Sequence, residues 1–493
     1  MTTVDLPALQ VVVPLVGALL CGLLRRPGPA WLLALAVSWA MVPIAAMLLH
    51  QAMTTGPISY HIGNWEPPWG IEYRVDAVSG FVLLLVASVG AVMMPYARRS
   101  VAAEVPEDKA AWFYAMYLLC LTGLLGITIT GDAFNAFVFL EISSLATYVL
   151  IAMGRDRRAL LASYQYLIMG TIGATFYVIG VGLLYTMTGT LNMADLAQRL
   201  GSVEQVRPIL AGLAFLTVGI GLKLALFPLH VWLPNAYAYA PSFATAFLAA
   251  SATKVAIYLL LRFFFSIAGV GLVFETLPVT DALLALSIAA MFGASLVAVF
   301  QQNVKRMLAY SSVAQIGYIT LGIALASKTG LTGAIVHVFN HALMKGALFM
   351  LVGAMVLQVG SCRLHDLAGI GRRMPLTTAG LVLAGVSLIG APLTVGFVSK
   401  WYLVVASWEQ DMAWLAILVL LSSVISLIYF GRIVEFAWFR PTSAAAVEAR
   451  DPPLSMLLPA WVMVAACIYF GIDTTLTVGV AERAADVLLA GLK

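Results

Sequence analysis

Charged side chains are scarce in this sequence. Only 10% of its 493 residues are Asp, Glu, Lys or Arg, whereas 62% are hydrophobic. Soluble globular domains carry about 25% charged residues, so the composition excludes an ordinary soluble protein. No long polar stretch interrupts the apolar sequence, which excludes a large soluble domain. The 27 basic residues are scattered over loops and form no patch, which argues against nucleic-acid binding despite the net charge of +4.

Cysteine is also scarce. The four cysteines, Cys21, Cys120, Cys362 and Cys467, are far apart in the sequence, which excludes a CxxC metal or redox motif and a disulfide framework. The Gly-rich stretch "GTIGATFYVIGVG" is not followed by the Lys and Ser or Thr of a phosphate loop. It is more typical of a helix-packing surface. We therefore expect no cofactor and no metal ion in this chain.

Apolar runs long enough to cross a bilayer, which takes about 20 residues in a helix, are abundant. The first run has no basic region before it, so we expect a spanning helix and not a cleaved signal peptide. The predicted fold class is an all-α polytopic membrane protein with about 14 transmembrane helices. The expected helices cover residues 5–24, 30–50, 75–96, 111–130, 132–153, 161–188, 207–227, 241–266, 277–300, 304–326, 330–357, 376–403, 411–438 and 454–473. The amphipathic tail, 477–493, is expected to lie at the interface or to be disordered.

The seventh and twelfth predicted helices carry helix-breaking residues beside a lysine. Pro228 and Pro234 follow Lys223 in "GLKLALFPLHVWLP", and Gly and Pro residues precede Lys400 in "GAPLTVGFVSK". Broken helices in the two halves of a chain indicate an internal repeat. An odd number of helices in each copy gives the two copies opposite topology. We expect helices 1–3 in residues 1–110, a first inverted repeat (helices 4–8) in 111–266, a second (helices 9–13) in 277–438, and the last helix with a short tail in 454–493.

The distribution of basic residues predicts the orientation. Lys and Arg are more frequent in loops after odd-numbered helices than in loops after even-numbered helices. Cytoplasmic loops carry the excess of basic residues, so both termini are expected on the outer side. The expected location is the bacterial cytoplasmic (inner) membrane.

Titratable side chains interrupt several of the apolar runs. A charge near the bilayer centre costs at least about 2.5–3.5 kcal/mol, so each of these residues is a candidate for function. A buried lysine can release and regain a proton, and histidine does so near neutral pH. The set is mainly cationic, which suits proton transfer better than binding of Na⁺, an ion that requires oxygen ligands. The candidate proton pathway consists of Glu141, Lys223, Lys254, His337, His341, Lys345 and Lys400.

Simpler interpretations of these residues stay open. His337 and His341 are four residues apart and share a helix face, so they could bind a metal or haem, although no carboxylate or cysteine lies near them. They could equally be a hydrogen-bonded pair in the core. Glu141 and Lys223 could form a purely structural ion pair. His230 could be a surface residue or a gating residue.

Several segments resemble a known family. The block "GLKLALFPLHVWLPNAYAYAP" and the stretches "FVFLEISSLATYVLI", "NVKRMLAYSSVAQIGYI", "HVFNHALMKGALFML" and "GAPLTVGFVSKW" are similar to the antiporter-like subunits shared by Mrp-type cation/proton antiporters, complex I and membrane-bound hydrogenases. The resemblance extends over most of the chain. Within the family it is greatest to the D subunit of the Mrp Na⁺/H⁺ antiporter, through the chain length and the segment "HIGNWEPPWGIEYRVDAVSG".

The resemblance implies roles for the matched positions. Glu141 and Lys223 are similar to the family's paired carboxylate and lysine, and Lys254 is similar to its relay lysine between two half-channels. The segment 337–345 resembles the connecting histidines and lysine of the eleventh helix. Lys400 resembles the terminal lysine that exchanges protons with one side of the membrane. Some relatives carry a glutamate there, which this chain does not.

These observations together predict a proton-translocating subunit of a multi-subunit Na⁺ (cation)/H⁺ antiporter, a transport protein and not an enzyme. Its expected partners are other membrane subunits, the lipid bilayer, H⁺ and Na⁺. One alternative is a proton-pumping subunit of a complex I-like or hydrogenase-like redox complex, whose redox centres would lie on other subunits. Another is a scaffold that transports nothing.

Overall fold

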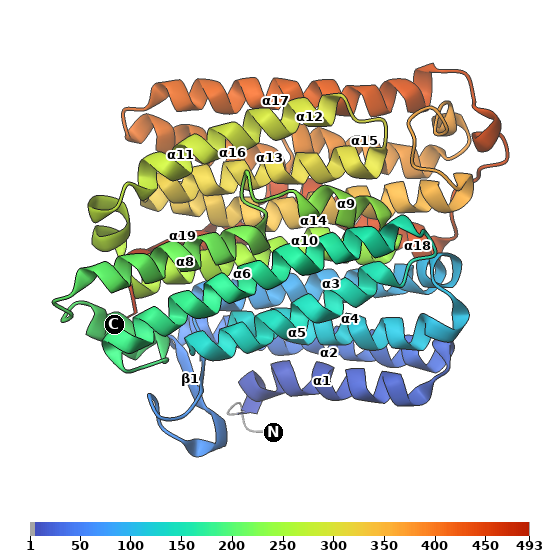
Figure 1. Cartoon of the computed structure of the whole chain (residues 1–493). Coiled ribbons are helices and arrows are strands. Elements are labelled where there is room, and N and C mark those ends of the chain that lie inside the picture. Colours follow the sequence, from blue (N-terminus) through green and yellow to red (C-terminus); the bar gives the residue numbers. More distant parts are fainter. Residues whose placement is uncertain (1–4, 493) are drawn as a thin grey trace.

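The chain folds into a bundle of long helices that lie side by side (Figure 1). The computed structural model describes residues 5–492. Within them, 13 helices are long and apolar enough to cross a membrane. The predicted fold class, an all-α polytopic membrane protein, is confirmed.

The described part of the first half of the chain contains ten α-helices and a small hairpin. The hairpin strands β1 (Ile58–His61) and β2 (Glu72–Val75) pair antiparallel between α2 and α3. The helices are α1 (Leu6–Leu24), α2 (Pro27–Thr54), α3 (Ala77–Glu104), α4 (Glu107–Ile129), α5 (Ala133–Ala152), α6 (Arg158–Thr188), α7 (Met193–Leu200), α8 (Val206–Leu224), α9 (Trp232–Tyr239) and α10 (Ser242–Leu261), and α10 continues in a wider turn to Ile267.

The second half, as far as residue 492, contains nine further α-helices. They are α11 (Val279–Ala289), α12 (Ser295–Val299), α13 (Val304–Ala324), α14 (Lys328–Val359), α15 (Pro375–Ile389), α16 (Val395–Glu409), α17 (Ala413–Val434), α18 (Leu454–Ile472) and α19 (Thr475–Ala490). A wider turn, Ala290–Ala294, joins α11 to α12, so these two form one span. Another, Glu435–Phe439, extends α17.

The two predicted helix breaks are present. Helix α8 ends at Leu224, Ala225 adopts a left-handed conformation (φ 61°), and the short helix α9 follows. The segment predicted as one twelfth helix, 376–403, consists of α15 and α16, separated at Gly390 (φ 95°) and Leu393 (φ 67°). Positive φ is strained for residues with a side chain, so the backbone must leave the helical path at these points.

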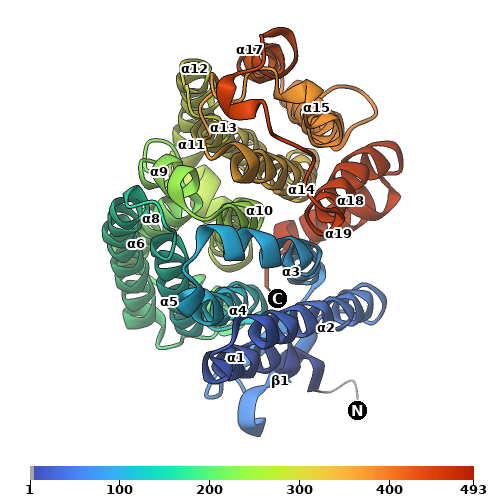
Figure 2. The same ribbon diagram turned by 90° about the vertical axis from the view of Figure 1, so that its right-hand side faces the viewer.

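Helices α10 and α13 lie deepest in the bundle. In each, 94% of the most apolar stretch is buried, against 39% in α2. Figure 2, which views the bundle from one end, shows α10 and α14 near its middle. A helix in this position contacts protein on all sides, so polar side chains on it cannot reach lipid or bulk water.

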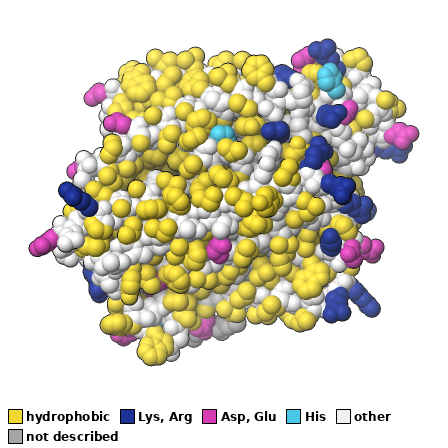
Figure 3. Space-filling model, in the orientation of Figure 1, with side chains coloured by type: hydrophobic (Ala, Val, Ile, Leu, Met, Phe, Trp, Pro, Cys, Tyr) yellow, Lys and Arg dark blue, Asp and Glu magenta, His cyan; other side chains and the backbone are white. Residues whose placement is uncertain are grey.

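The apolar surface and the basic residues are segregated. Hydrophobic side chains cover the flank of the bundle, while Lys and Arg gather at one end of the helices (Figure 3). We call this the basic end. It is where the loops after odd-numbered spans emerge, so it is the cytoplasmic end in the predicted orientation.

The C-terminal tail is helical over most of its described residues, so of the two alternatives predicted from the sequence, an interfacial helix or disorder, disorder is wrong. Residues Thr475–Ala490 form α19, which packs against α14 and α3. Its apolar face, which includes Val480, Ala484 and Leu488, is buried, and Asp486 forms an ion pair with Lys328 at the start of α14. The apolar face of the amphipathic pattern therefore packs on protein, and an interfacial position of α19 stays a prediction.

Candidate functional site

The first part of the candidate pathway lies where α8 ends beside α5. The Nζ atom of Lys223 is 4.0 Å from Oε1 of Glu141. It donates hydrogen bonds to Oγ of Ser144, at 2.7 Å, and to the hydroxyl of Tyr148, at 3.4 Å. These three α5 residues are three and four positions apart, so they lie on one helix face. The structure therefore brings the predicted pair together, with the Lys223 side chain buried and the Glu141 side chain 28% exposed.

Close packing of α6 holds this group in place. Gly170 of α6 lies against the hydroxyl of Tyr148, and a Cβ atom at this position would collide with that hydroxyl and approach Nζ of Lys223 to 3.3 Å. A cavity of about 30 Å³ adjoins Lys223 and Ser144, and Val255 of α10 lines its other side. It has room for at least one water molecule. The space between Lys223 and the helix that carries Lys254 is therefore partly open.

Lys254 is fully buried in the middle of α10. Its Nζ atom donates hydrogen bonds to the carbonyl oxygen of Ala249, at 2.5 Å, and to Oγ1 of Thr253, at 3.4 Å. Within residues 5–492 no carboxylate lies within ion-pair distance of this amine. An ammonium group buried without a counter-ion is costly. The charged form of Lys254 therefore depends on water, which suits a group that is charged only transiently.

The two histidines of α14 differ in their hydrogen bonding. The ring of His337 bridges two helices, with Nδ1 2.7 Å from Oγ of Ser399 and Nε2 2.9 Å from Oε1 of Gln315. His341 is fully buried, and neither of its ring nitrogens has a partner among the described residues. The two ring centroids are 6.2 Å apart. An unpaired buried imidazole indicates a place for water, so a water molecule would be needed to continue the row at His341.

Lys345 lies one turn beyond His341 on α14 and contacts α13. Its Nζ atom donates a hydrogen bond of 2.8 Å to the carbonyl oxygen of Leu308 and a short one to Oγ of Ser311. The side chain is fully buried and has no carboxylate partner in the described chain. Its surroundings thus resemble those of Lys254, with neutral acceptors only.

Lys400 lies one turn into α16, at the second helix break. Its Nζ atom donates to the carbonyl oxygen of Ile389 at 2.8 Å and to Oγ of Ser423 at 2.9 Å, and it lies 4.7 Å from the centre of the Tyr318 ring. The carbonyl belongs to the last turn of α15, which the break leaves without a helical N–H partner. A cation at the C-terminal end of a helix is stabilised by the helix dipole. The break itself therefore supplies acceptors for Lys400.

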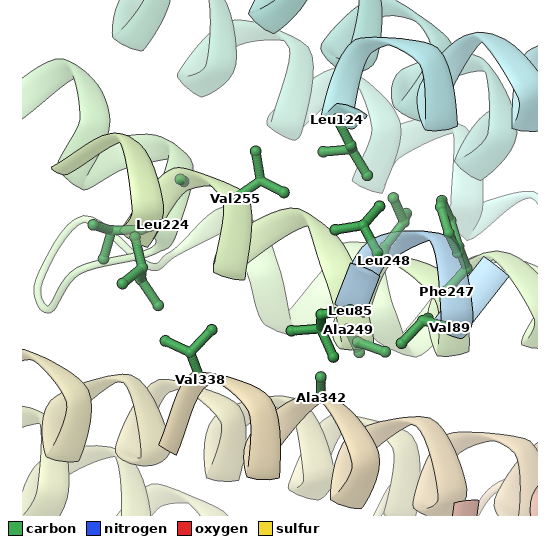
Figure 4. Close-up of a cluster of buried hydrophobic side chains, with 14 of the residues drawn as sticks. Leu85, Val89, Leu124, Leu224, Phe247, Leu248, Ala249, Val255, Val338 and Ala342 are labelled. Atoms are coloured by element: carbon green, nitrogen blue, oxygen red, sulfur yellow. The ribbon is translucent and has the colours of Figure 1, made fainter. Parts of the chain in front are cut away.

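Apolar side chains fill the space between these polar groups. Figure 4 shows Leu224, Val255 and Leu248 around α10, with Val338 and Ala342 of α14 facing it. All are buried. Apolar packing lowers the local dielectric and excludes bulk solvent. The described structure therefore separates the polar groups into short segments that water molecules would have to join.

His230, the candidate gating residue, lies outside this row. Its ring stacks on Phe227 with centroids 5.1 Å apart and meets Tyr310 of α13 edge-on. It is half-buried in the loop after α8. Across the described residues no group of three or more His, Cys, Asp or Glu side chains could hold a metal ion.

Two buried ion pairs escaped the sequence analysis. Lys305 at the start of α13 lies 3.9 Å from Glu104 at the end of α3. Arg262 lies 2.5 Å from Asp76, at the opposite end of α3. The sequence places each of these basic residues at the edge of an apolar run, where a loop position is the simplest interpretation, and only the fold brings the acidic partner next to it.

These features define a multi-pass membrane protein in which buried Lys and His side chains, with one partly exposed Glu, lie between two broken helices in the core. The family described as "NADH:quinone oxidoreductase/Mrp antiporter, TM" matches residues 130–426. The chain belongs to this family and is an antiporter-like membrane subunit.

Curated relatives include subunits of an oxidoreductase and of an antiporter. A protein of Desulforudis audaxviator (strain MP104C) named NADH-quinone oxidoreductase subunit N is 42% identical over 487 residues, which cover 95% of this chain and 96% of that protein. A protein of Bacillus subtilis (strain 168), named as the D subunit of a Na(+)/H(+) antiporter, is 29% identical over 448 residues, 91% of this chain and 90% of that protein.

A solved structure has the same fold over nearly the whole chain. It is a chain of the membrane-bound sulfane sulfur reductase, described as an archaeal respiratory membrane complex. The two chains superpose with a TM-score of 0.90 at 31% identity, over 99% of this chain and 98% of that one. The similarity therefore covers both broken helices and the row between them.

Proposed function

We propose that this chain translocates protons along Glu141, Lys223, Lys254, His337, His341, Lys345 and Lys400. The observation that carries the proposal is a set of buried amines and imidazoles whose partners are mostly neutral: hydroxyls and carbonyl oxygens. Intramembrane ionisable residues are costly and mark ion pathways by default. Glu141, the one carboxylate of the set, can favour the charged form of Lys223 and so couple two proton-transfer steps.

The arrangement also supports the predicted domain organisation. We propose that 111–266 and 277–438 are two inverted repeats, because each contains one helix broken at membrane depth beside a lysine. The first three spans, in 1–110, and the last span with its α19 tail, in 454–493, would then flank the repeats. His230, at the first break and in contact with α13, is retained as a possible gating residue.

We propose a multi-subunit Na⁺ (cation)/H⁺ antiporter of the Mrp type as the complex in which this chain works. The relative from Bacillus subtilis is named as the D subunit of a Na(+)/H(+) antiporter and matches 91% of this chain. In such a complex the deep cationic row would move H⁺, and oxygen-rich sites on other subunits would hold Na⁺. The chain would lie in the bacterial cytoplasmic membrane with both termini outside.

A redox-driven complex is the second candidate. Its support is specific: the relative named as a subunit of NADH-quinone oxidoreductase is 42% identical, and the solved structure with a TM-score of 0.90 comes from a respiratory complex. Mass spectrometry of the intact purified complex separates the candidates. Iron–sulfur or NiFe subunits would identify a redox complex, and small hydrophobic antiporter subunits would identify an antiporter.

Proton transport by the purified complex in proteoliposomes tests the proposed function. We expect Lys223→Ala to abolish transport while the subunits still assemble, because the amine that Glu141 can switch is missing. Arg483→Ala is a matched control. Arg483 is also a cation, but it lies on the exposed face of α19 and is not part of the row. Normal transport in an assembled Lys223→Ala complex would refute the proposal and favour a scaffold.

A further inference from the structure

A polar cavity of about 530 Å³ opens at the basic end of the bundle. It lies between the end of α3, the α5–α6 and α9–α10 loops, the start of α13 and the loop after α14. Its walls carry Arg155, Asp156, Arg158, Cys362, Arg363 and Asp366. We call this cavity the vestibule. Arg158 holds the pKa of Asp156 below its usual range, so the wall remains ionised and the cavity is suited to water.

The floor of the vestibule is a buried charged pair bridged by a serine. Glu104 accepts hydrogen bonds from the backbone N–H and the hydroxyl of Ser242, both at 2.8 Å. Lys305 donates to the same hydroxyl at 2.9 Å and lies 3.9 Å from Glu104. Lys305 is 4% exposed and Glu104 18%. Because Ser242 opens α10, the carboxylate also faces the positive end of that helix.

Two observations connect this pair with Lys345, deeper in the bundle. Lys305, Leu308 and Ser311 are three residues apart along α13, and the last two supply the acceptors of Lys345. The acceptors of the Lys345 amine thus begin one turn deeper than Lys305 on α13. Second, the hydroxyl of Tyr96 is fully buried and has no partner among the described residues.

The unpaired Tyr96 hydroxyl lies beside Ser242. A Cβ atom at Gly353 of α14 would meet both the Tyr96 hydroxyl and, at 2.9 Å, Oγ of Ser242. Gly353 is eight residues, about two turns, beyond Lys345 on α14. A buried hydroxyl without a partner needs explanation, and an unseen water is the usual one. The gap between the vestibule floor and Lys345 therefore has a polar group free to hold water.

We propose that the vestibule is the entrance through which protons from the basic end reach the row, and that they join it at Lys345, with Glu104 and Lys305 as the gate. This rests on the proposed proton transport. Protons would enter near the middle of the row and not at Lys223. The alternative is a purely structural role, in which Glu104 caps α10 and ties α3 to α13.

Cys362 provides a test in the assembled complex. Its thiol lies in the vestibule wall and is partly exposed, whereas Cys21, Cys120 and Cys467 are buried. A membrane-impermeant cationic methanethiosulfonate (MTSET) applied to membrane vesicles from either side should modify Cys362 from the basic end. We expect proton transport to fall about tenfold or more, because the adduct fills the entrance and places a fixed cation in it.

The matched control is Cys362→Ser, which has no thiol and should transport normally with or without the reagent. Burial raises the pKa of the Cys362 thiol, so labelling should be run at mildly alkaline pH, where more thiolate is present. Complete modification with transport within about twofold of the untreated rate would overturn the proposal. Failure to modify Cys362 from either side would overturn it too, since water would then not reach the vestibule.

Glu104→Gln tests the gate without closing the entrance. The amide keeps a hydrogen-bond acceptor for Ser242 but cannot ionise, so a structural cap would be largely preserved. We expect transport to fall severalfold and its pH profile to change, with thermal stability and MTSET labelling as in the parent complex. An unchanged pH profile and rate would overturn the gating role. Lys223→Ala tests the proposed proton transport independently of the vestibule. If Lys223→Ala abolishes transport but MTSET has no effect, the proton pathway stands and only the proposed entrance is refuted.

Discussion

The two broken helices place a lysine beside the break in different ways. At the first break, Lys223 precedes the interruption and has a carboxylate, Glu141, at 4.0 Å. At the second break, Lys400 follows the interruption and is held by the carbonyl of Ile389, the hydroxyl of Ser423 and the ring of Tyr318. Among the described residues no carboxylate comes within ion-pair distance of Lys400.

The difference indicates how the protonation of each amine can be controlled. Moving Glu141 toward or away from Lys223 changes the electrostatic cost of the proton on that lysine. Lys400 has fixed partners, namely backbone carbonyls and a helix end that do not titrate. We infer that the first break is the controlled end of the row and the second break is a passive end.

The largest effects should come from arginine at either lysine. Lys223→Arg and Lys400→Arg keep the positive charge, but guanidinium does not release its proton. If protons pass through these amines, both variants should lose transport by about 100-fold or more. The measurement is proton flux in proteoliposomes at matched complex content. Retained flux in either variant would mean that its lysine acts only through its charge.

A smaller effect is expected from Glu141→Gln. Loss of the carboxylate removes the group that makes Lys223 switchable, and we expect transport to fall by about tenfold. A useful comparison is Ser423→Ala, which removes a neutral partner of Lys400. If both variants slow transport equally, the distinction between a controlled and a passive end is wrong.

The second break should be sensitive to added volume. Gly396, in the first turn of α16, packs against the carbonyl oxygen of Ser387 in α15, and a Cβ atom there would collide with it. Gly396→Ala should therefore cost about 1–3 kcal/mol of stability, measured by thermal unfolding of the detergent-purified complex. Gly431→Ala is the control: its Cβ would meet open space in the second half of α17. Equal melting temperatures would show that α15 and α16 are not held tightly together.

The smallest effect is expected from Ser144→Ala. Its hydroxyl accepts a hydrogen bond from Lys223 but carries no charge. Loss of one such bond is worth about 0.5–1.5 kcal/mol, so we expect a reduction in transport rate of a few fold, smaller than that from Glu141→Gln. A larger loss from Ser144→Ala than from Glu141→Gln would mean that the serine, and not the carboxylate, controls Lys223.

Local sequence signals predicted the spans and both breaks. Bilayer-length apolar runs determine where helices lie, and Pro228, Gly390 and Pro392 mark points where a helix cannot continue. The deep lysines and histidines could be found because charge within an apolar run is conspicuous. The pairing of Glu141 with Lys223 was also predictable, because each is a charged residue within an otherwise apolar run.

The remaining contacts depend on tertiary packing. Ser242 is 138 residues from Glu104 and 63 from Lys305, and each of the three lies at a helix end, where polar residues are ordinary. The packing of α19 on α14 could not be predicted, because an amphipathic helix has the same pattern whether its apolar face meets lipid or protein. In both cases the sequence shows which residues are polar or apolar, but only the fold shows which distant residues they contact.

The central claim is that buried amines and imidazoles are joined by water into one proton route. A high-resolution electron cryomicroscopy map of the assembled complex tests it most directly. We predict ordered water beside both ring nitrogens of His341 and in the small cavity between Lys223 and α10, linking the polar segments. A map of the same quality with apolar side chains sealing those gaps, and no water between the segments, would contradict the account.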